Sequence, residues 1–247
     1  GEGAKEPYAL YAASNLGSML ALLSYPLLVE PCIRVSGQLR LWSAGYAALG
    51  LLVLGCGLFI VAQPSRPRVE VPDGASSTSI GWARRLRWAW LAFVPSSLML
   101  GVTTYLTTDL AAVPLLWVLP LALYLLTFIL VFARRAWLAP EFAPIWLPPL
   151  LLLVAWNQAA GSEPRPALFL LHLGTYFLVA LVCHGALAAD RPPASGLTGY
   201  YLAMSIGGVL GGLFNALAAP LLFSRIVEYP LVLGLACLAL PAAAQKT

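Results

Sequence analysis

The polar side chains that could form a binding site in this sequence are few, and each lies within or beside a long apolar segment. In "TTYLTTDLAAVPLLW", Thr108 and Asp109 follow Tyr105 by about one helical turn. A carboxylate beside hydroxyl groups could bind a small cation. At the start of a helix, the same Asp109 could instead accept hydrogen bonds from backbone N–H groups as an N-cap. Both interpretations stay open at this point.

Two asparagines and two histidines are the remaining candidates. Asn15 and Asn215 each lie inside an apolar segment, where a carboxamide can bridge two helices or line a polar cavity. His172 and His184 fall on one expected helix, roughly 18 Å apart, and their directions differ by about 120°. They therefore cannot share one metal ion. His172 is either a hydrogen-bonded packing residue or a further lining residue of a polar site.

No motif of a catalytic or cofactor site is present. The sequence has no Gly-x-Ser-x-Gly, no His-Glu-x-x-His and no phosphate-binding loop, and "GGVLGG" at 207–212 lies inside an apolar segment with no strand before it. Cys32, Cys56, Cys183 and Cys237 form no Cys-x-x-Cys pair, and we interpret them as packing residues. We therefore expect no catalytic residue, cofactor or metal ion in these 247 residues.

Composition indicates which elements must position these side chains. The chain is 60% hydrophobic and only 10% charged, whereas soluble domains are about 25% charged. Segments long enough for a transmembrane helix, about 20 residues, fall at about 8–29, 41–63, 88–108, 110–133, 143–160, 167–188, 199–223 and 229–245. We predict an all-α, polytopic integral membrane helix bundle of about eight transmembrane helices, forming a single transmembrane domain over 1–247. Its partner is the lipid bilayer, and the net charge of +4 does not indicate nucleic acid.

The distribution of basic residues predicts the orientation. Most of the 14 Lys and Arg residues fall on one side of the eight expected spans, so both termini are predicted to be cytoplasmic. The segment 64–87, rich in Pro, Ser and Gly, is expected to be a mobile cytoplasmic loop. It runs into "RRLRWAW", which places arginines and tryptophans at the headgroup level, either as a topological anchor or as a site for anionic lipid.

Two expected helices share a pattern of small residues. Aligning Pro26 with Pro220 places "LGSMLALLSYPLL" over "LGGLFNALAAPLL". Small residues can let another helix backbone approach closely, and we expect such packing faces at Ala13, Gly17, Ala21, Gly207, Gly211 and Gly212. The match would suit two related halves of a transporter of the major facilitator kind. Chance similarity of two glycine-rich helices accounts for it equally well.

Three stretches resemble a known family: "EPYALYAASNLGSMLALLSYPLLVEP", "VTTYLTTDLAAVPLLWVLPLALYLLTFILVF" and "YYLAMSIGGVLGGLFNALAAPLLF". They look like the membrane region of bacterial fused major-facilitator/spermidine-synthase-like proteins. The resemblance implies that the chain is part of a longer protein of the bacterial inner membrane. Further membrane helices would precede it, and a cytoplasmic domain resembling aminopropyltransferases would follow. Polyamine or related nucleoside-thioether chemistry would belong to that domain, since its glycine-rich and acidic motifs have no counterpart here.

Three functions are compatible with these features. The first is a transporter-like membrane domain for an unknown small, cationic solute. The second is a membrane anchor and regulatory scaffold for a cytoplasmic aminopropyltransferase-like domain. The third is a structural subunit of a larger membrane complex, in which the polar and small residues serve helix packing alone. The sequence by itself does not choose among them.

Overall fold

The computed structural model describes residues 7–62, 80–110, 115–133, 143–160, 166–224 and 227–239, and all regular elements within them are helices. Five of these are long and apolar enough to cross a membrane: Leu10–Cys32, Val35–Ala62, Trp82–Thr108, Ala167–Ala189 and Leu197–Leu222. Shorter apolar helices cover Val118–Phe132, Ile145–Ala160 and Glu228–Cys237. The prediction of an all-helical chain with several apolar helices of membrane-spanning length is confirmed for the described residues.

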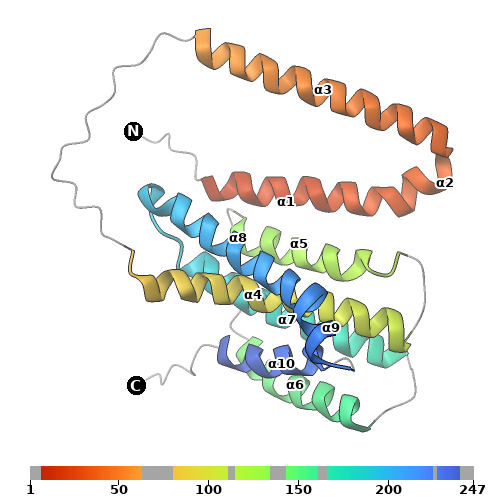
Figure 1. Cartoon of the computed structure of the whole chain (residues 1–247), viewed down its shortest axis with the longest axis vertical. Helices are drawn as coiled ribbons and strands as arrows, with labels where there is room; N and C mark the ends of the chain where they lie inside the picture. The colour runs from red at the N-terminus through yellow and green to blue at the C-terminus, as the bar shows by residue number, and fades with distance from the viewer. Residues whose placement is uncertain are drawn as a thin grey trace. The chain divides into compact units, whose positions relative to one another are not determined.

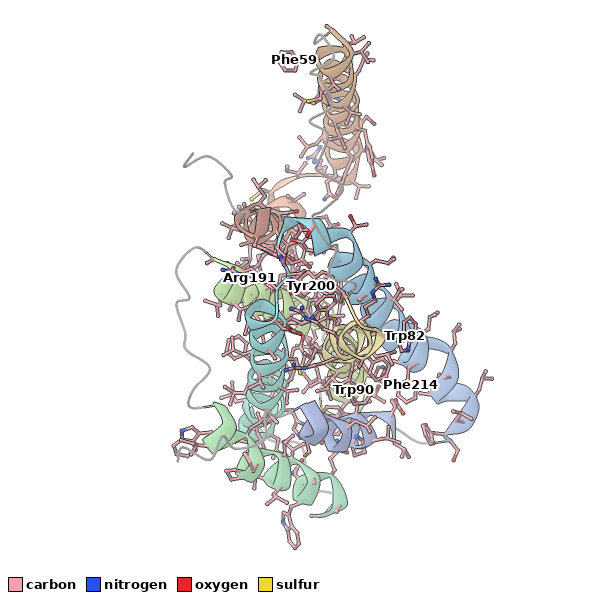
Figure 2. The ribbon with its side chains drawn as sticks, turned by 90° about the vertical axis from the view of Figure 1, so that its left-hand side faces the viewer. Phe59, Trp82, Trp90, Arg191, Tyr200 and Phe214 are labelled. Carbon is pink, nitrogen blue, oxygen red and sulfur yellow. The ribbon has the colours of Figure 1, made fainter. Side chains whose placement is uncertain are left out.

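The chain divides into two compact units, one made of Gly1–Leu22 with Ile80–Thr247 and the other of Leu23–Ser79. The smaller unit contains η1 (Tyr25–Val29), α2 (Glu30–Cys32) and α3 (Val35–Ala62). No residue of α3 is buried, and large apolar side chains such as Leu51 and Phe59 are exposed along it (Figure 2). A helix that is apolar on all sides is typical of a segment solvated by lipid.

The larger unit is built around one central helix. It contains α1 (Pro7–Ser24) up to Leu22, α4 (Trp82–Tyr105) continuing into η2 (Leu106–Leu110), α5 (Val118–Phe132), α6 (Ala143–Ala160), α7 (Pro166–Ala189), η4 (Ala194–Gly196), α8 (Leu197–Leu213), η5 (Phe214–Ala218), α9 (Ala219–Leu222) and α10 (Glu228–Ala239). α4 packs along α8 on one side and along α7 and α10 on the other, and α5 and α6 pack on α7 (Figure 1).

The helix α4 begins earlier than the predicted span, which started at 88. Trp82 to Arg87 form its first turns, because arginine is a good helix former although hydropathy alone excludes it from a span. Of the predicted loop 64–87, residues 64–79 lie outside the described part of the chain. The last residues of the predicted loop, from Trp82 to Arg87, therefore belong to α4.

The helices that contain the two aligned stretches end in the same way. Each has a π-helical turn, η1 or η5, followed by a short helix whose second residue is proline, Pro31 or Pro220. Proline has no N–H to donate to the preceding turn. The next cap residues are extended, Ile33 at φ −123°, ψ 123° and Phe223 at φ −122°, ψ 133°. The geometry therefore pairs Pro220 with Pro31, a different register from the sequence alignment that paired it with Pro26.

The contact between α4 and α8 is a backbone-to-backbone approach. A Cβ on Gly207 would collide with the carbonyl group of Ala89, and one on Gly211 would lie 2.8 Å from the Phe93 carbonyl oxygen. Ser96 Oγ donates to the Gly208 carbonyl oxygen across the same interface at 2.9 Å. This packing fixes α8 directly against α4, which in turn positions the ends of both helices.

Candidate functional site

Four helices bring polar side chains together at one end of the larger unit. The side chains are Tyr105 from the end of α4, Asn157 from the end of α6, His172 from the start of α7 and Tyr229 from the start of α10. His172 Nδ1 lies 2.9 Å from the Tyr229 hydroxyl, and His172 Nε2 lies 3.2 Å from Asn157 Oδ1. Tyr105 donates to the same Oδ1 at 3.5 Å. All four residues are buried, and we call them the His172 cluster.

The hydrogen bonds of the His172 cluster set the direction of each donor. The Asn157 carboxamide oxygen only accepts, so His172 Nε2 carries a proton in this arrangement. In the neutral ring, Nδ1 then accepts the hydroxyl proton of Tyr229. The ring centroids of Tyr105 and His172 lie 4.5 Å apart, and those of Tyr105 and Tyr229 lie 5.6 Å apart. The cluster is therefore an oriented set of uncharged hydrogen-bonding groups with aromatic faces.

Three further buried polar atoms on the same helices lack a hydrogen-bond partner among the described residues, and one of them, His184 Nε2, lies farther along α7. Gln158 follows Asn157 on α6, and Thr175 lies one turn after His172 on α7. Gln158 Nε2 and Thr175 Oγ1 have no hydrogen-bond partner among the described residues. A buried polar atom without a partner costs roughly 1–3 kcal/mol. The segments that adjoin Asn157 and His172 in the sequence therefore contain buried polar atoms whose hydrogen bonds helix packing does not satisfy.

The residues predicted from the sequence to line a site do not all meet. Tyr105 and His172 share the cluster. Asn15 donates to the Tyr11 carbonyl oxygen of its own helix at 2.8 Å, and Asn215 donates to Ser97 Oγ on α4 at 2.6 Å. Thr108 is exposed in η2. The backbone of Asp109 also lies in η2, and its side chain lies outside the described residues.

Sequence reasoning did not single out Asn157 and Tyr229. Asn157 lies near the end of α6 and Tyr229 at the start of α10. Polar and aromatic residues at such helix termini commonly mark the membrane surface. A carboxamide close to the end of an apolar helix was the only indication in the sequence. Their role becomes visible only because four helix ends converge.

The small-residue positions also differ in their surroundings. Gly207 and Gly211 are buried against α4, whereas a Cβ on Gly212 or Gly17 would meet nothing within 4 Å. Ala13 and Ala21 are exposed. Gly207 and Gly211 are therefore the predicted glycine positions that the structure places against the backbone of α4.

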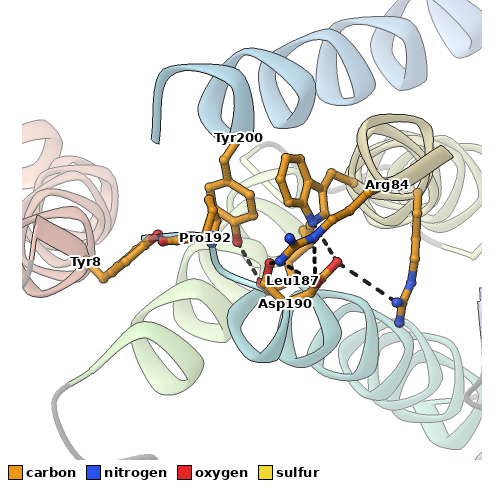
Figure 3. Close-up of polar contacts among 8 residues, drawn as sticks. Tyr8, Arg84, Leu187, Asp190, Pro192 and Tyr200 are labelled. Carbon is orange, nitrogen blue, oxygen red and sulfur yellow. Dashed lines mark hydrogen bonds and ion pairs between the residues drawn. The ribbon is translucent and has the colours of Figure 1, made fainter. Parts of the chain in front are cut away.

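A second polar network lies at the opposite end of the same helices (Figure 3). Asp190, just after α7, accepts from Arg84 Nε at 2.9 Å and from Trp88 Nε1 at 2.8 Å. Tyr200 and Tyr8 donate to backbone carbonyl oxygens next to it, those of Leu187 at 2.8 Å and Pro192 at 2.7 Å. The polar side chains of this network are paired with one another or with backbone carbonyl groups, so we assign it to holding α1, α4, α7 and α8 together.

The fold and the two polar networks define a helical protein whose long apolar helices suit contact with the lipid bilayer. Comparison with protein-family models, with curated proteins and with solved structures finds no match to this chain. The function of this chain is therefore inferred from its residues and their geometry.

Replacing Asn215 with alanine should lower the thermal stability of the bundle, and replacing Asn15 with alanine should not. Asn215, in η5, bonds Ser97 on α4, whereas the hydrogen bond described for Asn15 stays within its own helix. Interhelical hydrogen bonds in membranes average about 0.6 kcal/mol. Thermal unfolding of the two variants in the same detergent measures the difference. Equal shifts would contradict the bridging role.

Proposed function

We propose that this chain is the membrane domain of a spermidine-synthase-like protein and that it binds a small polar solute at the His172 cluster, within a transporter-like bundle. The observation that carries the proposal is the convergence of four buried polar side chains from four apolar helices. Polar residues inside membrane segments are costly and commonly mark solute or ion pathways. Transporter sites also form where helices meet, rather than along one helix.

The proposed architecture has eight transmembrane helices, with a likeness to the major facilitator fold. If successive helices cross the membrane in alternating directions, the ends of α4 and α6 and the starts of α7 and α10 face the same side of the membrane. The four members of the His172 cluster come from these helix termini, which supports the alternating arrangement of the spans. Arg84 near the start of α4 contacts Asp190 after the end of α7, as an antiparallel pair requires.

The proposed location is the bacterial inner membrane, with both termini in the cytoplasm. The four basic side chains described in the larger unit, those of Arg84, Arg85, Arg87 and Arg191, all lie at the end of the bundle opposite the His172 cluster. Basic residues favour the cytoplasmic side. The His172 cluster would then lie toward the outer side of the membrane.

The chemistry of the cluster suits a solute that carries amine groups. The tyrosine hydroxyl oxygens can accept hydrogen bonds from an ammonium group, and the ring faces of Tyr105 and Tyr229 attract cations. A polyamine is the cationic solute that the family resemblance suggests.

Replacing His172 with glutamine should weaken spermidine binding by about tenfold or more, because His172 orients the Tyr229 hydroxyl and a hydrogen bond from that oxygen to a charged group contributes about 1.5–3 kcal/mol. The measurement is equilibrium binding of radiolabelled spermidine to the purified chain, followed by uptake into proteoliposomes. Asn157→Ala and Tyr229→Phe should act in the same direction, because both remove partners of His172.

His184→Gln is the matched control for that experiment. His184 lies on the same helix, is equally buried, and bonds Thr127 on α5 at 2.7 Å, away from the cluster. Its replacement should leave spermidine binding intact. Equal losses in the His172 and His184 variants would contradict the assignment of the site. If the wild-type chain shows no saturable binding, the solute proposal is rejected.

One observation favours a second function, that of an anchor or structural subunit. No residue of α3 is buried within the smaller unit, although α3 is 28 residues long and largely apolar. Helices of partner subunits could cover part of this surface in place of lipid. Recovery of a stoichiometric membrane partner that protects α3 from a lipid-soluble label would support this function, and uniform labelling of α3 in the native membrane would oppose it.

A further inference from the structure

The described basic side chains of the larger unit are gathered at one end of the bundle. Arg84, Arg85 and Arg87 lie in the first turns of α4, and Arg191 follows α7. Asp190 is the one acidic side chain that the structure describes at this end. Among the described side chains, this end therefore holds four arginines and a single carboxylate, an excess of positive charge. We call these five residues the basic end.

The Asp190 carboxylate already has two close partners within the chain. Asp190 Oδ1 pairs with Arg84 at 2.8 Å, and Oδ2 accepts from Trp88 Nε1 at 2.8 Å. Arg87 approaches Oδ2 only to 3.9 Å, and its side chain is 62% exposed. Arg85 is exposed and makes no ion pair with the residues that the structure describes. Among the described residues, Arg85 therefore has no ion-pair partner, and Arg87 has only the long contact with a carboxylate that Arg84 already holds.

The position of these arginines along α4 places them at the membrane surface. The candidate span begins at Trp82, so Arg85 and Arg87 occupy its first two turns. Trp82, labelled in Figure 2, is 71% exposed, and Leu86 is 52% exposed. Trp82 precedes Arg85 by three positions and Leu86 by four, so it is a helix-surface neighbour of each. Tryptophan and arginine beside apolar side chains form the arrangement that suits the headgroup level.

We propose that the basic end binds the phosphodiester headgroups of anionic phospholipids through Arg85 and Arg87. Residues two positions apart do not share a helix face, so the two arginines contact different headgroups on either side of α4. A guanidinium group donates two parallel hydrogen bonds to a phosphate. The bound lipids neutralise the charge that Asp190 leaves uncompensated. This lipid binding is independent of the proposed solute site.

The test uses the full chain, purified in detergent and titrated with phosphatidylglycerol or phosphatidylcholine. Native mass spectrometry measures the lipid that remains bound. Wild-type protein should retain phosphatidylglycerol preferentially, and added salt should weaken that preference. Replacing Arg85 or Arg87 with glutamine should weaken phosphatidylglycerol binding roughly fivefold at each position, as expected for about 1 kcal/mol per basic residue.

Two control variants test whether lipid binding depends on the position of the arginines and on their charge. Arg34→Gln with Arg40→Gln removes the same charge from the smaller unit, where neither side chain forms an ion pair among the described residues, and should leave the lipid preference unchanged. Arg85→Lys with Arg87→Lys keeps the charge and should retain most of the preference. If the Arg34/Arg40 variant loses as much lipid, or if wild-type protein binds both lipids equally, the proposal is wrong.

A competition experiment distinguishes a lipid headgroup from a soluble phosphate as the ligand of the basic end. Inorganic phosphate or glycerol phosphate at millimolar concentration should not displace phosphatidylglycerol, because Trp82 and Leu86 contact the lipid beyond its phosphate. Complete displacement by either soluble anion would overturn the lipid assignment.

Discussion

Replacing Gly207 with alanine should destabilise the helix bundle by about 1–3 kcal/mol, the range for overpacking a tightly packed site. A Cβ at this position would collide with the backbone of Ala89, lying 2.8 Å from its carbonyl carbon and 2.9 Å from its Cα. A backbone atom cannot rotate away as a side chain can. α8 would have to separate from α4, which would also strain the Ser96–Gly208 hydrogen bond.

Thermal unfolding of the purified variant, followed by size-exclusion chromatography, measures this effect. Gly208→Ala and Gly212→Ala are the matched controls, because a Cβ at either position meets nothing within 4 Å. Alanine favours a helix by up to about 1 kcal/mol over glycine, so the controls should be neutral or more stable. A Gly207 variant that behaves like these controls would show that α4 and α8 do not approach as closely as described.

Replacing Asp190 with alanine should cost about 2–3 kcal/mol of stability. Trp88 is fully buried, and its Nε1–H would lose its acceptor, a loss of about 1–3 kcal/mol. Arg84 is 42% exposed, so water can solvate it and its pairing adds at most about 1 kcal/mol. The larger part of the loss therefore comes from the indole and not from the salt bridge.

Asp190→Asn separates these two contributions. Its carboxamide oxygen can still accept from Trp88, so this variant should lose less stability than Asp190→Ala. Trp88→Phe removes the same hydrogen bond from the other partner, and a double-mutant cycle with Asp190→Ala should show a coupling of about 1 kcal/mol or more. Additive effects of the two changes would contradict the assigned hydrogen bond.

The positions of the helices were predictable from the sequence because the tendency to span a membrane is a local property. Apolar runs such as 167–188 and 143–160 correspond to α7 and α6 almost residue for residue. The start of α4 was less predictable, since its arginines favour a helix but oppose membrane insertion. Hydropathy reports the second effect only, so the predicted boundary fell too late.

The candidate site was only partly predictable. His172 and Tyr105 stood out as polar groups in apolar surroundings, but their partners Asn157 and Tyr229 did not. His172 and Tyr229 are 57 positions apart in the chain, and Tyr105 and Asn157 are 52 apart. No periodic pattern links residues at such separations. Their meeting depends on how the ends of four helices converge.

The small residues show the same division between sequence and tertiary structure. The sequence alone determined that the stretches around Gly17 and Gly207 are helices with small side chains spaced four apart. It did not determine which of them receives a partner. The tertiary structure places the α4 backbone on Gly207 and leaves Gly17 with nothing within 4 Å. A small side chain permits close approach, but the approach itself depends on a second helix, whose position is set by contacts elsewhere in the bundle.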